Sequence, residues 1–196
     1  MTHYYSDNSN LVSKKETFEY YFNNEKFLFT TDNGVFSKRN VDYGSYVLIK
    51  SVYHLDLGKR VLDLGCGYGP IGIIIKHFNP DIQLTMVDVN PRAISLAKEN
   101  ILQNDIASKI LCEDNILNIK DDFDSIILNP PIRAGKKVIY DLYEKSYQKL
   151  ISGGSLYIVI AKRHGYNSTK EKLESIFTEV KVLDKDKGYF VLQALK

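Results

Sequence analysis

The sequence contains few cysteines and no long apolar run, and its first residues do not resemble a leader peptide. Only Cys66 and Cys112 are present among 196 residues, and they stand far apart with no histidine-rich partner segment. This usage favours two reduced thiols over a disulfide framework or a zinc site, with a single disulfide as the alternative. No apolar run approaches the ~20 residues of a membrane span, and the polar first ten residues are unlike a secretion signal. We expect a cytoplasmic protein without a membrane segment or a metal site.

The composition is that of a single globular domain. Hydrophobic residues make up 44% of the chain and aromatic residues 12%. No stretch lacks apolar side chains, which excludes an intrinsically disordered or low-complexity protein. At about 150 residues per domain, the length allows one domain with one sizeable core.

Basic residues are concentrated in one part of the chain, although the formal net charge is only +2. Residues 133–172 contain nine Lys or Arg and three Asp or Glu. Such a local excess can contact a polyanion such as RNA, and it can equally form a solvated surface. Charge alone leaves both interpretations open.

Strand-like and helix-like segments alternate along most of the chain. Strands are expected at 17–22, 26–31, 60–64, 83–89, 110–111, 123–128, 155–161, 179–183 and 189–192, and helices at 43–55, 71–78, 91–104, 138–150 and 168–177. Asn23 and Asn24 suit the hairpin turn between the first two strands. The alternation predicts an α/β fold with a mostly parallel, seven-stranded sheet, an antiparallel strand from the C-terminal hairpin, and a small N-terminal hairpin.

A glycine-rich segment follows the first strand of this alternation. The segment from Val61 to Pro70 reads VLDLGCGYGP, with glycine at every second position after the strand. Glycines at this spacing permit a tight turn and let a ligand approach the backbone, although they would also suit a plain connection. Pro70 stands where the third glycine of G-x-G-x-x-G would fall, which disfavours a nicotinamide or flavin cofactor.

Acidic and amide side chains follow the next two strands. Asp88 lies 21 positions after Gly67, where a carboxylate can accept hydrogen bonds from ribose hydroxyls or simply cap a turn. Asp114 and Asn115 follow the short strand 110–111. They are placed to meet the amine and a ring nitrogen of an adenine, with an ordinary surface loop as the alternative.

Two consecutive prolines follow the strand 123–128. In Asn129-Pro130-Pro131-Ile132 the prolines fix the backbone and remove two donors, so that the Asn129 amide and the carbonyl groups can face a substrate as acceptors. A planar amino group suits such acceptors. Asn-Pro-Pro is also an ordinary way to end a strand.

Together these segments resemble the class I S-adenosylmethionine-dependent methyltransferases over roughly residues 34–196. Val61 to Gly69 is similar to the first motif of that family, Asp88 to its ribose-binding acid, and Asn129 to Ile132 to its amino-methylating tetrapeptide. The resemblance implies a Rossmann-like fold and S-adenosylmethionine as the cofactor. The implied cofactor-binding residues are Asp63, Gly65, Cys66, Gly67, Gly69, Asp88, Val89, Asp114, Asn115 and Asn129, and the implied catalytic residues are Asn129, Pro130, Pro131 and Ile132.

Several segments resemble one subfamily, the guanine-N2 methyltransferases of small-subunit ribosomal RNA. They are residues 34–37 (GVFS), 41–45 (VDYGS), 129–136 (NPPIRAGK) and 186–190 (DKGYF). The implied partner is ribosomal RNA or the small ribosomal subunit. The implied substrate contacts are Phe36, Arg133, Lys136, Lys137, Lys162 and Arg163. In this interpretation residues 1–33 are an extension whose hairpin packs on the core, and residues 34–196 are the methyltransferase domain.

Two features depart from that subfamily. Its better-known members carry an N-terminal duplicate domain that we do not find in this sequence, and position 132 holds isoleucine where an aromatic residue is usual. Stacking on the target base must then come from another residue or be replaced by apolar packing. The same tetrapeptide also serves adenine-N6 and protein-glutamine methyltransferases, and a cofactor- or RNA-binding module without transfer activity is the non-enzymatic alternative.

Overall fold

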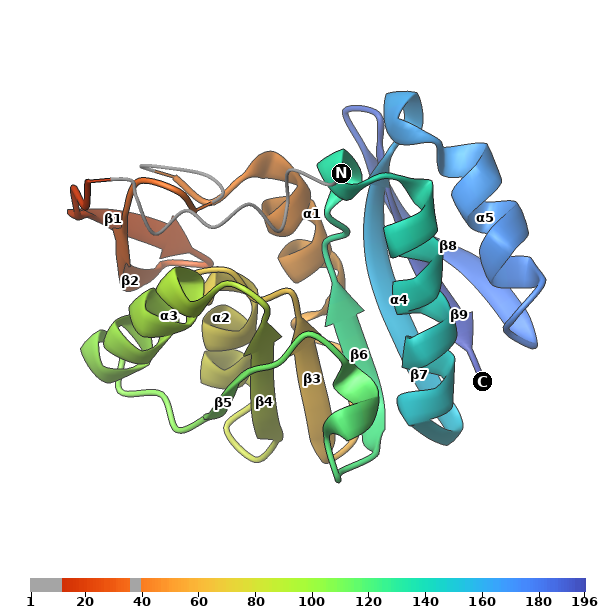
Figure 1. The fold of residues 1–196 in the computed structure, drawn as a ribbon, viewed down its shortest axis with the longest axis horizontal. Coiled ribbons are helices and arrows are strands. Elements are labelled where there is room, and N and C mark those ends of the chain that lie inside the picture. The colour runs from red at the N-terminus through yellow and green to blue at the C-terminus, as the bar shows by residue number, and fades with distance from the viewer. Residues whose placement is uncertain (1–11, 36–39) are drawn as a thin grey trace.

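A seven-stranded sheet lies between two layers of helices in the computed structural model, which describes residues 12–35 and 40–196 (Figure 1). The strands are β3 (Arg60–Leu64), β4 (Gln83–Asp88), β5 (Lys109–Cys112), β6 (Phe123–Leu128), β7 (Leu150–Ala161), β8 (Glu179–Asp186) and β9 (Tyr189–Leu195). Their order across the sheet is β5-β4-β3-β6-β7-β9-β8. The first five strands in this order are parallel, and β9 is antiparallel to both β7 and β8. The predicted sheet, with its antiparallel C-terminal hairpin strand, is confirmed.

Helices cover both faces of the sheet. They are α1 (Tyr43–Val52), α2 (Pro70–Phe78) and α3 (Pro91–Gln103) on one face, and α4 (Lys136–Lys149) and α5 (Tyr166–Glu174) on the other. Successive strand residues point to opposite faces. Val61 therefore packs with the first group of helices and Leu62 with the second. Both faces need apolar side chains, which explains the continuous apolar runs of the central strands.

Helix α3 begins at an asparagine cap, whereas the bounds of α1 and α5 differ from the predicted ones. Asn90 caps α3 by accepting the backbone N–H of Arg92 at 3.0 Å. Helix α1 ends at Val52 rather than Leu55, because the Leu55 N–H turns back to the Val52 carbonyl. Helix α5 spans Tyr166–Glu174 instead of 168–177, since Gly165, with φ of 98°, starts it two residues earlier.

The predicted break at residues 151–154, between the helix 138–150 and the strand 155–161, is wrong. Strand β7 begins at Leu150, directly after α4, and passes through Gly153 and Gly154. The Gly153 N–H donates to the Lys196 carbonyl at 3.1 Å, and the Lys196 N–H donates to the Gly154 carbonyl at 3.0 Å. A Cβ atom at Gly154 would lie 2.9 Å from the Asp124 carbonyl oxygen. These glycines therefore allow two stretches of backbone to approach closely, and they do not break the strand.

Three short 3-10 helices follow strands at one edge of the sheet and were not predicted. They are η2 (Ile116–Asn118), η3 (Ile132–Ala134) and η4 (Lys162–His164). They come after β5, β6 and β7 respectively. Each is a single turn, too short to show a periodic apolar pattern.

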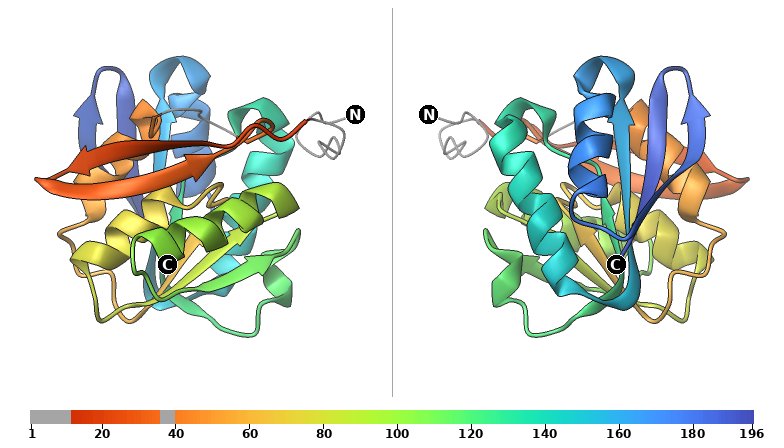
Figure 2. Two further views of the ribbon diagram at one scale, coloured as in Figure 1. Left: turned by 90° about the vertical axis from the view of Figure 1, so that its left-hand side faces the viewer. Right: turned by 90° about the vertical axis from the view of Figure 1, so that its right-hand side faces the viewer.

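The predicted N-terminal hairpin is present and lies across α3 (Figure 2). It consists of β1 (Glu16–Phe22) and β2 (Glu25–Thr31), joined at Asn23 and Asn24 with φ of 49° and 67°. The Asn100 amide accepts the Thr30 N–H at 2.7 Å and donates to the Thr30 carbonyl at 3.0 Å. One turn later Asn104 makes the same pair of bonds to Leu28. One side chain of α3 and one that caps its end thus satisfy backbone groups on the free edge of β2.

Within the described residues, no helix combines the length and the apolar character that crossing a membrane requires. Cys66 is buried, Cys112 is exposed, and both are free thiols.

Candidate functional site

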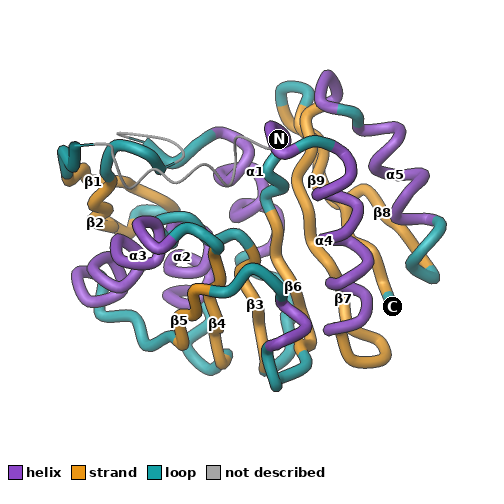
Figure 3. The backbone as a smooth tube through the Cα atoms, viewed as in Figure 1, coloured by secondary structure: helices purple, strands orange, loops and turns teal. Residues whose placement is uncertain are grey.

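The loops that follow the parallel strands meet at one edge of the sheet (Figure 3). Leu64 and Leu128 are register partners at the ends of β3 and β6. Gly65 and Asn129, the next residues along the chain, therefore leave neighbouring strand ends. The chain runs outward from β3 to β5 and then returns to β6 on the other side. The two residues thus lie at the topological switch point, where open α/β sheets bind ligands.

The glycine loop after β3 exposes its backbone. The N–H groups of Gly65 and Cys66 both donate to the Val87 carbonyl, at 2.8 and 2.9 Å. Gly65 and Gly67 have φ of 70° and 58°, and a Cβ atom at either position would meet nothing within 4 Å. A ligand can therefore lie directly against this backbone. Gly69 differs, because a Cβ atom there would lie 2.6 Å from the Met86 methyl group.

Asp88 closes the loop from the neighbouring strand. Its Oδ2 accepts the Gly67 N–H at 2.9 Å, and its Oδ1 accepts the Asn90 N–H at 2.8 Å. Burial raises the pKa of Asp88, and these two N–H groups oppose the shift. Each carboxylate oxygen keeps a further lone pair with which it can accept a ligand hydroxyl. Val89, the next residue, is half-buried.

Asp63 lies beneath the loop, fully buried on β3. Its Oδ2 accepts the Gly72 N–H at 2.8 Å, while Oδ1 has no partner among the described residues. Burial, reinforced by the charge of Asp88, raises the pKa of Asp63 to about 7. A buried carboxylate oxygen without a donor is a place where a cationic or hydrogen-bonding ligand group would be accommodated.

The loop after β5 is organised by Glu113, a residue that sequence analysis missed. Its Oε1 accepts the backbone N–H groups of Asp114 and Asn115 and the Asn118 amide, each at 3.1 Å. These donors lower the pKa of Glu113. Asp114 is exposed, whereas the Asn115 side-chain oxygen caps η2 by accepting the Leu117 N–H at 3.3 Å. No motif signals Glu113, because two of its three partners are backbone N–H groups, which any sequence supplies.

Asn129 is held from one side by the start of α1. Its Nδ2 donates to the Ser45 hydroxyl oxygen at 3.0 Å, and it lies 3.3 and 3.4 Å from the two carboxylate oxygens of Asp42. Asp42 also caps α1, accepting the Ser45 N–H at 3.1 Å. The Asn129 Oδ1 accepts no hydrogen bond from any described residue. This amide is therefore satisfied at its donor end and open at its acceptor end.

The two prolines continue the chain out of β6. Pro130 is buried and Pro131 half-buried. The Pro131 carbonyl accepts the Ala134 N–H at 2.9 Å and starts η3, whereas the Pro130 carbonyl accepts none of the hydrogen bonds formed by the described residues. Ile132 is half-buried and packs on the apolar cluster below α4 and α5. Two acceptors, one on Asn129 and one on Pro130, thus stand beside each other in the sequence.

The basic segment divides into two sets. Four of its nine cations form ion pairs with nearby acids: Lys145, Lys149, Lys170 and Lys172. The other five are exposed, and within the described structure none of them pairs with an acid: Arg133, Lys136, Lys137, Lys162 and Arg163. They follow β6 and β7, on the side of Asn129 away from the glycine loop. The edge therefore has two halves. The glycine loop and the acidic residues lie over β3, β4 and β5 and form the glycine-loop half, and the five cations lie over β6 and β7 and form the cationic half.

Lys187 extends the cationic half, and sequence analysis did not single it out as a contact. It lies in the turn between β8 and β9, with its ammonium 5.0 Å from the centre of the Tyr43 ring. Tyr43 in turn contacts Tyr189, with ring centres 5.6 Å apart. The Lys162 N–H donates to the Gly188 carbonyl at 2.7 Å and ties this turn to η4. Phe36, another predicted contact, lies outside the described residues.

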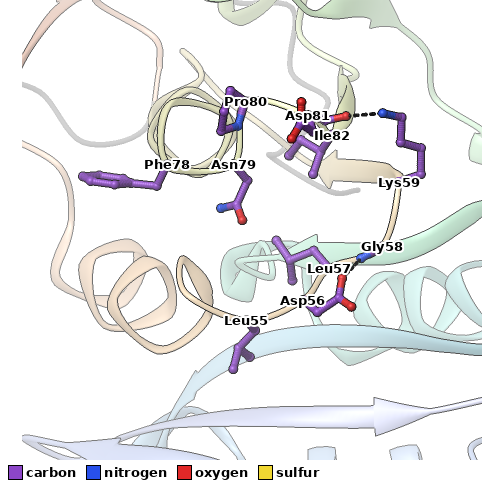
Figure 4. A pocket seen from close by; sticks show the side chains of 10 residues that line it. All are labelled: Leu55, Asp56, Leu57, Gly58, Lys59, Phe78, Asn79, Pro80, Asp81 and Ile82. Atoms are coloured by element: carbon purple, nitrogen blue, oxygen red, sulfur yellow. Dashed lines mark hydrogen bonds between the residues drawn. The ribbon is translucent and has the colours of Figure 1, made fainter.

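A separate depression of about 370 Å³ lies at the opposite edge of the sheet (Figure 4). It is lined by residues from the turns that precede β3 and β4, including Leu57, Lys59, Asn79 and Ile82. None of the predicted site residues that the structure describes lines it. Across the part of the chain that the structure describes, no group of three His, Cys, Asp or Glu side chains could hold a metal ion.

Comparison with known proteins identifies the fold. The model of the methyltransferase small domain matches residues 26–193. The chain is 44% identical over 197 residues to the uncharacterized protein YbxB of Bacillus subtilis (strain 168), covering 99% of this chain and 98% of that protein. The T. thermophilus 16S rRNA N2 methyltransferase RsmC, solved with AdoMet and guanosine, superposes with a TM-score of 0.82 at 24% identity, over 93% of this chain and 50% of that one.

Named relatives are longer than this chain. The Ribosomal RNA small subunit methyltransferase C of Mannheimia succiniciproducens is 36% identical over 130 residues, which are 64% of this chain and 39% of that protein. The site fits the cofactor of these proteins, since the backbone of Gly65 and Gly67 faces open space beside the buried oxygens of Asp63 and Asp88. The resemblance seen in the motifs is confirmed: the chain belongs to the methyltransferase small domain family and is an S-adenosylmethionine-dependent methyltransferase.

Proposed function

We propose that this protein methylates the exocyclic N2 amine of a guanine in small-subunit ribosomal RNA. One observation carries the proposal. The Asn129 Oδ1, which is open to accept a hydrogen bond, lies at the switch point, between the glycine-loop half and the cationic half of the edge. A planar amine attached to a polyanion would be held by this arrangement, because acceptors face its N–H groups and cations face its phosphates.

The names of the relatives support the same substrate. Relatives at 33–36% identity are named small-subunit ribosomal RNA methyltransferases, and the RsmC structure contains guanosine. This chain spans only 39% to 50% of the length of those proteins, so their substrate comes to it as a proposal.

The residues of the glycine-loop half have distinct tasks in this proposal. The backbone from Gly65 to Gly69 would hold the methionine portion of S-adenosylmethionine, Asp88 its ribose, and Asp114 with Asn115 its adenine. The cofactor supplies a methyl group on a sulfonium sulfur, and transfer to nitrogen leaves a thioether and one proton to be released to solvent. Asp63 on β3 accepts the Gly72 N–H and so ties the first turn of α2, which follows the loop, to the strand that precedes it.

Asn129 and Pro130 would prepare the nucleophile. The lone pair of an exocyclic amine is delocalised into the ring. If its two N–H groups donate to the Asn129 Oδ1 and the Pro130 carbonyl, the nitrogen is drawn toward a pyramidal shape and the lone pair is localised. No strongly basic side chain is needed. Holding the reactants in this geometry can supply about 7 to 11 kcal/mol of the barrier reduction.

The cationic half would hold the RNA. A target base inside structured RNA must be unstacked to reach Asn129. The five unpaired cations named above, together with Lys187, can bind the flanking phosphates and stabilise the unstacked strand. Ile132 cannot offer an aromatic face, and Tyr43 and Tyr189, which lie near Asp42, are candidates to supply it.

Transfer of labelled methyl groups from S-adenosylmethionine tests the proposal. The acceptors are small ribosomal subunits from cells lacking this protein, naked ribosomal RNA and a protein fraction, followed by nucleoside digestion and mass analysis. We expect N2-methylguanosine from the subunit or the RNA. N6-methyladenosine or labelled glutamine without modified guanosine would retain the chemistry and refute the substrate, and cofactor binding without any transfer would refute the enzymatic role.

A further inference from the structure

The start of helix α1 contacts the donor end of Asn129 through two side chains that belong to neither the glycine loop nor the Asn-Pro-Pro segment. Asp42 and Ser45 lie three residues apart at the first turn of α1. The Ser45 hydroxyl donates to the Asp42 Oδ2, and the Ser45 oxygen accepts from the Asn129 Nδ2 at 3.0 Å. Both Asp42 oxygens lie within 3.4 Å of the same Nδ2. Three acceptor atoms thus surround one amide nitrogen.

The chemistry of these partners determines which way the Asn129 amide faces. An ionised carboxylate can only accept hydrogen bonds. The Ser45 hydroxyl hydrogen is already used on Asp42, so its oxygen presents only lone pairs to Asn129. If the amide were rotated by half a turn, its oxygen would face three acceptors and no donor. The NH2 group must therefore point to α1, and Oδ1 must point away from it.

We propose that Asp42 and Ser45 are positioning residues, which orient the Asn129 amide so that Oδ1 accepts an N–H of the amine to be methylated. This inference rests on the proposed function of Asn129. Without these two residues Asn129 would sample both amide orientations, and only one of them presents an acceptor to the amine. Helix α1 belongs to none of the motifs at the strand ends, yet its first turn determines the orientation of the Asn129 amide.

Helix capping alone does not require aspartate at position 42. A cap needs one oxygen to accept one backbone N–H, and Asn or Ser would serve as well. Aspartate adds a second acceptor and no donor, which is what Asn129 needs. Gly44 is tightly packed, since a Cβ atom there would lie 3.1 Å from the Asp42 Oδ1 and 3.2 Å from the Tyr189 ring, and these side chains would have to move to admit it. The segment Asp42-Tyr43-Gly44-Ser45 therefore caps α1, packs closely against Tyr189 at Gly44, and presents hydrogen-bond acceptors to Asn129.

The decisive variant is Asp42→Asn, which keeps the cap and replaces one acceptor oxygen by an NH2 group. We expect its kcat to fall about 10- to 100-fold, as for a misplaced catalytic group. Its Tm and its Kd for S-adenosylmethionine should stay at the wild-type values. Ser45→Ala, which retains Asp42, should show a smaller decrease in kcat. Asp121→Asn, at an exposed acid paired with Lys109, is the matched control and should leave kcat unchanged.

A double-mutant cycle tests whether Asp42 acts through Asn129. If it does, Asp42→Asn should reduce kcat in the wild-type background and have no further effect on Asn129→Ala. Multiplied effects of the two substitutions, or a wild-type kcat for both Asp42→Asn and Ser45→Ala, would overturn the inference.

The orientation of the Asn129 amide can also be measured without a methyl-accepting substrate. In ¹⁵N–¹H spectra the two Nδ2 hydrogens of Asn129 should shift in Asp42→Asn and Ser45→Ala and stay in place in Asp121→Asn. Unshifted signals in both site variants would overturn the inference. If the wild-type protein transferred no methyl group to guanine, the proposed function would fail, and these spectra would still decide whether Asp42 and Ser45 orient Asn129.

Discussion

Asp63 and Asp88, on neighbouring strands, are both buried and depend on backbone N–H groups for partners. Asp88 satisfies both of its oxygens in this way, whereas Asp63 satisfies one and leaves Oδ1 without a described donor. Burial raises the pKa of both carboxyl groups, and together with the charge of Asp88 it raises the pKa of Asp63 to about 7. Two buried carboxyl groups on the strands next to the glycine loop suit a cofactor that carries a positive charge.

Asp63 makes the stability of the protein depend on pH. Its pKa of about 7 in the folded state lies above its ordinary 3.8, so the folded state binds more protons in this range and loses stability as the pH rises. The loss should be about 3 kcal/mol in the free energy of unfolding between pH 5 and pH 8. Asp63→Asn, which keeps an acceptor for Gly72, should flatten this part of the curve in urea denaturation. Parallel curves for the two proteins would contradict the assignment.

Asn129→Ala should separate catalysis from cofactor binding. Removing the amide takes away an acceptor that is used when the amine reacts, and we expect single-turnover transfer to slow by about 100-fold or more. The Kd for S-adenosylmethionine, measured by calorimetry, should change far less. Equal turnover by the variant and the wild-type protein would rule out the proposed role of Asn129.

The N-terminal hairpin shows what an element needs in order to dock. Its outer strand β1 is half exposed, and its inner strand β2 presents a free backbone edge to α3. Asn100 and Asn104, one helical turn apart, satisfy that edge in the way a third strand would. Asn100 also donates to the Tyr68 carbonyl at 2.8 Å, which connects the hairpin to the end of the glycine loop.

Asn100→Ala should weaken this docking strongly. The variant would leave buried groups of Thr30 and the Tyr68 carbonyl without partners. Each unsatisfied buried group costs about 1–3 kcal/mol, so we expect a loss of roughly 3 kcal/mol or more in the free energy of unfolding. The Thr30 amide should also exchange its hydrogen faster. Leu102→Ala, at an exposed position of the same helix, is the control and should stay within about 0.5 kcal/mol of the wild-type protein.

At the scale of the whole molecule, the functional edge divides its charges between two halves. Acids that bind backbone groups lie over β4 and β5, and cations that pair with no acid of the described residues lie over β6 and β7. The remaining cations of the segment 133–172 are neutralised by ion pairs along α4 and α5. The chain therefore has a cationic surface at the functional edge, although its formal net charge is only +2.

The salt dependence of RNA methylation should report this surface. Changing Lys136 and Lys137 to Gln should lower kcat/KM for RNA at low salt and reduce the slope of log kcat/KM against log salt by about 1.4. The control variant changes Lys145 and Lys181 to Gln; both are paired with acids on their own elements, and the slope should be retained. A slope that is the same for both variants and for the wild-type protein would refute phosphate binding by Lys136 and Lys137.

Most of the sheet could be predicted from the sequence, because its information is local. Strands β3 and β6 were predicted residue for residue, since each is a short apolar run between polar turns. The hairpin turn at Asn23 and Asn24 was recognised for the same reason. Predictions failed where a distant partner decides the conformation, as at Gly153 and Gly154, which pair with the end of the chain.

By itself the sequence determined the strand-loop-helix order, and hence that Gly65, Asp88 and Asn129 would follow strands ending at one edge. The residue spacing suffices for this, because parallel connections of one hand allow few arrangements. The tertiary structure alone decided which groups face them. The contact of Asp42 with Asn129 joins residues 87 positions apart, and the contact of Asn100 with Thr30 joins residues 70 apart. Hydrogen bonds over such separations leave no periodic signal in a sequence, since they depend on packing that only the folded chain creates.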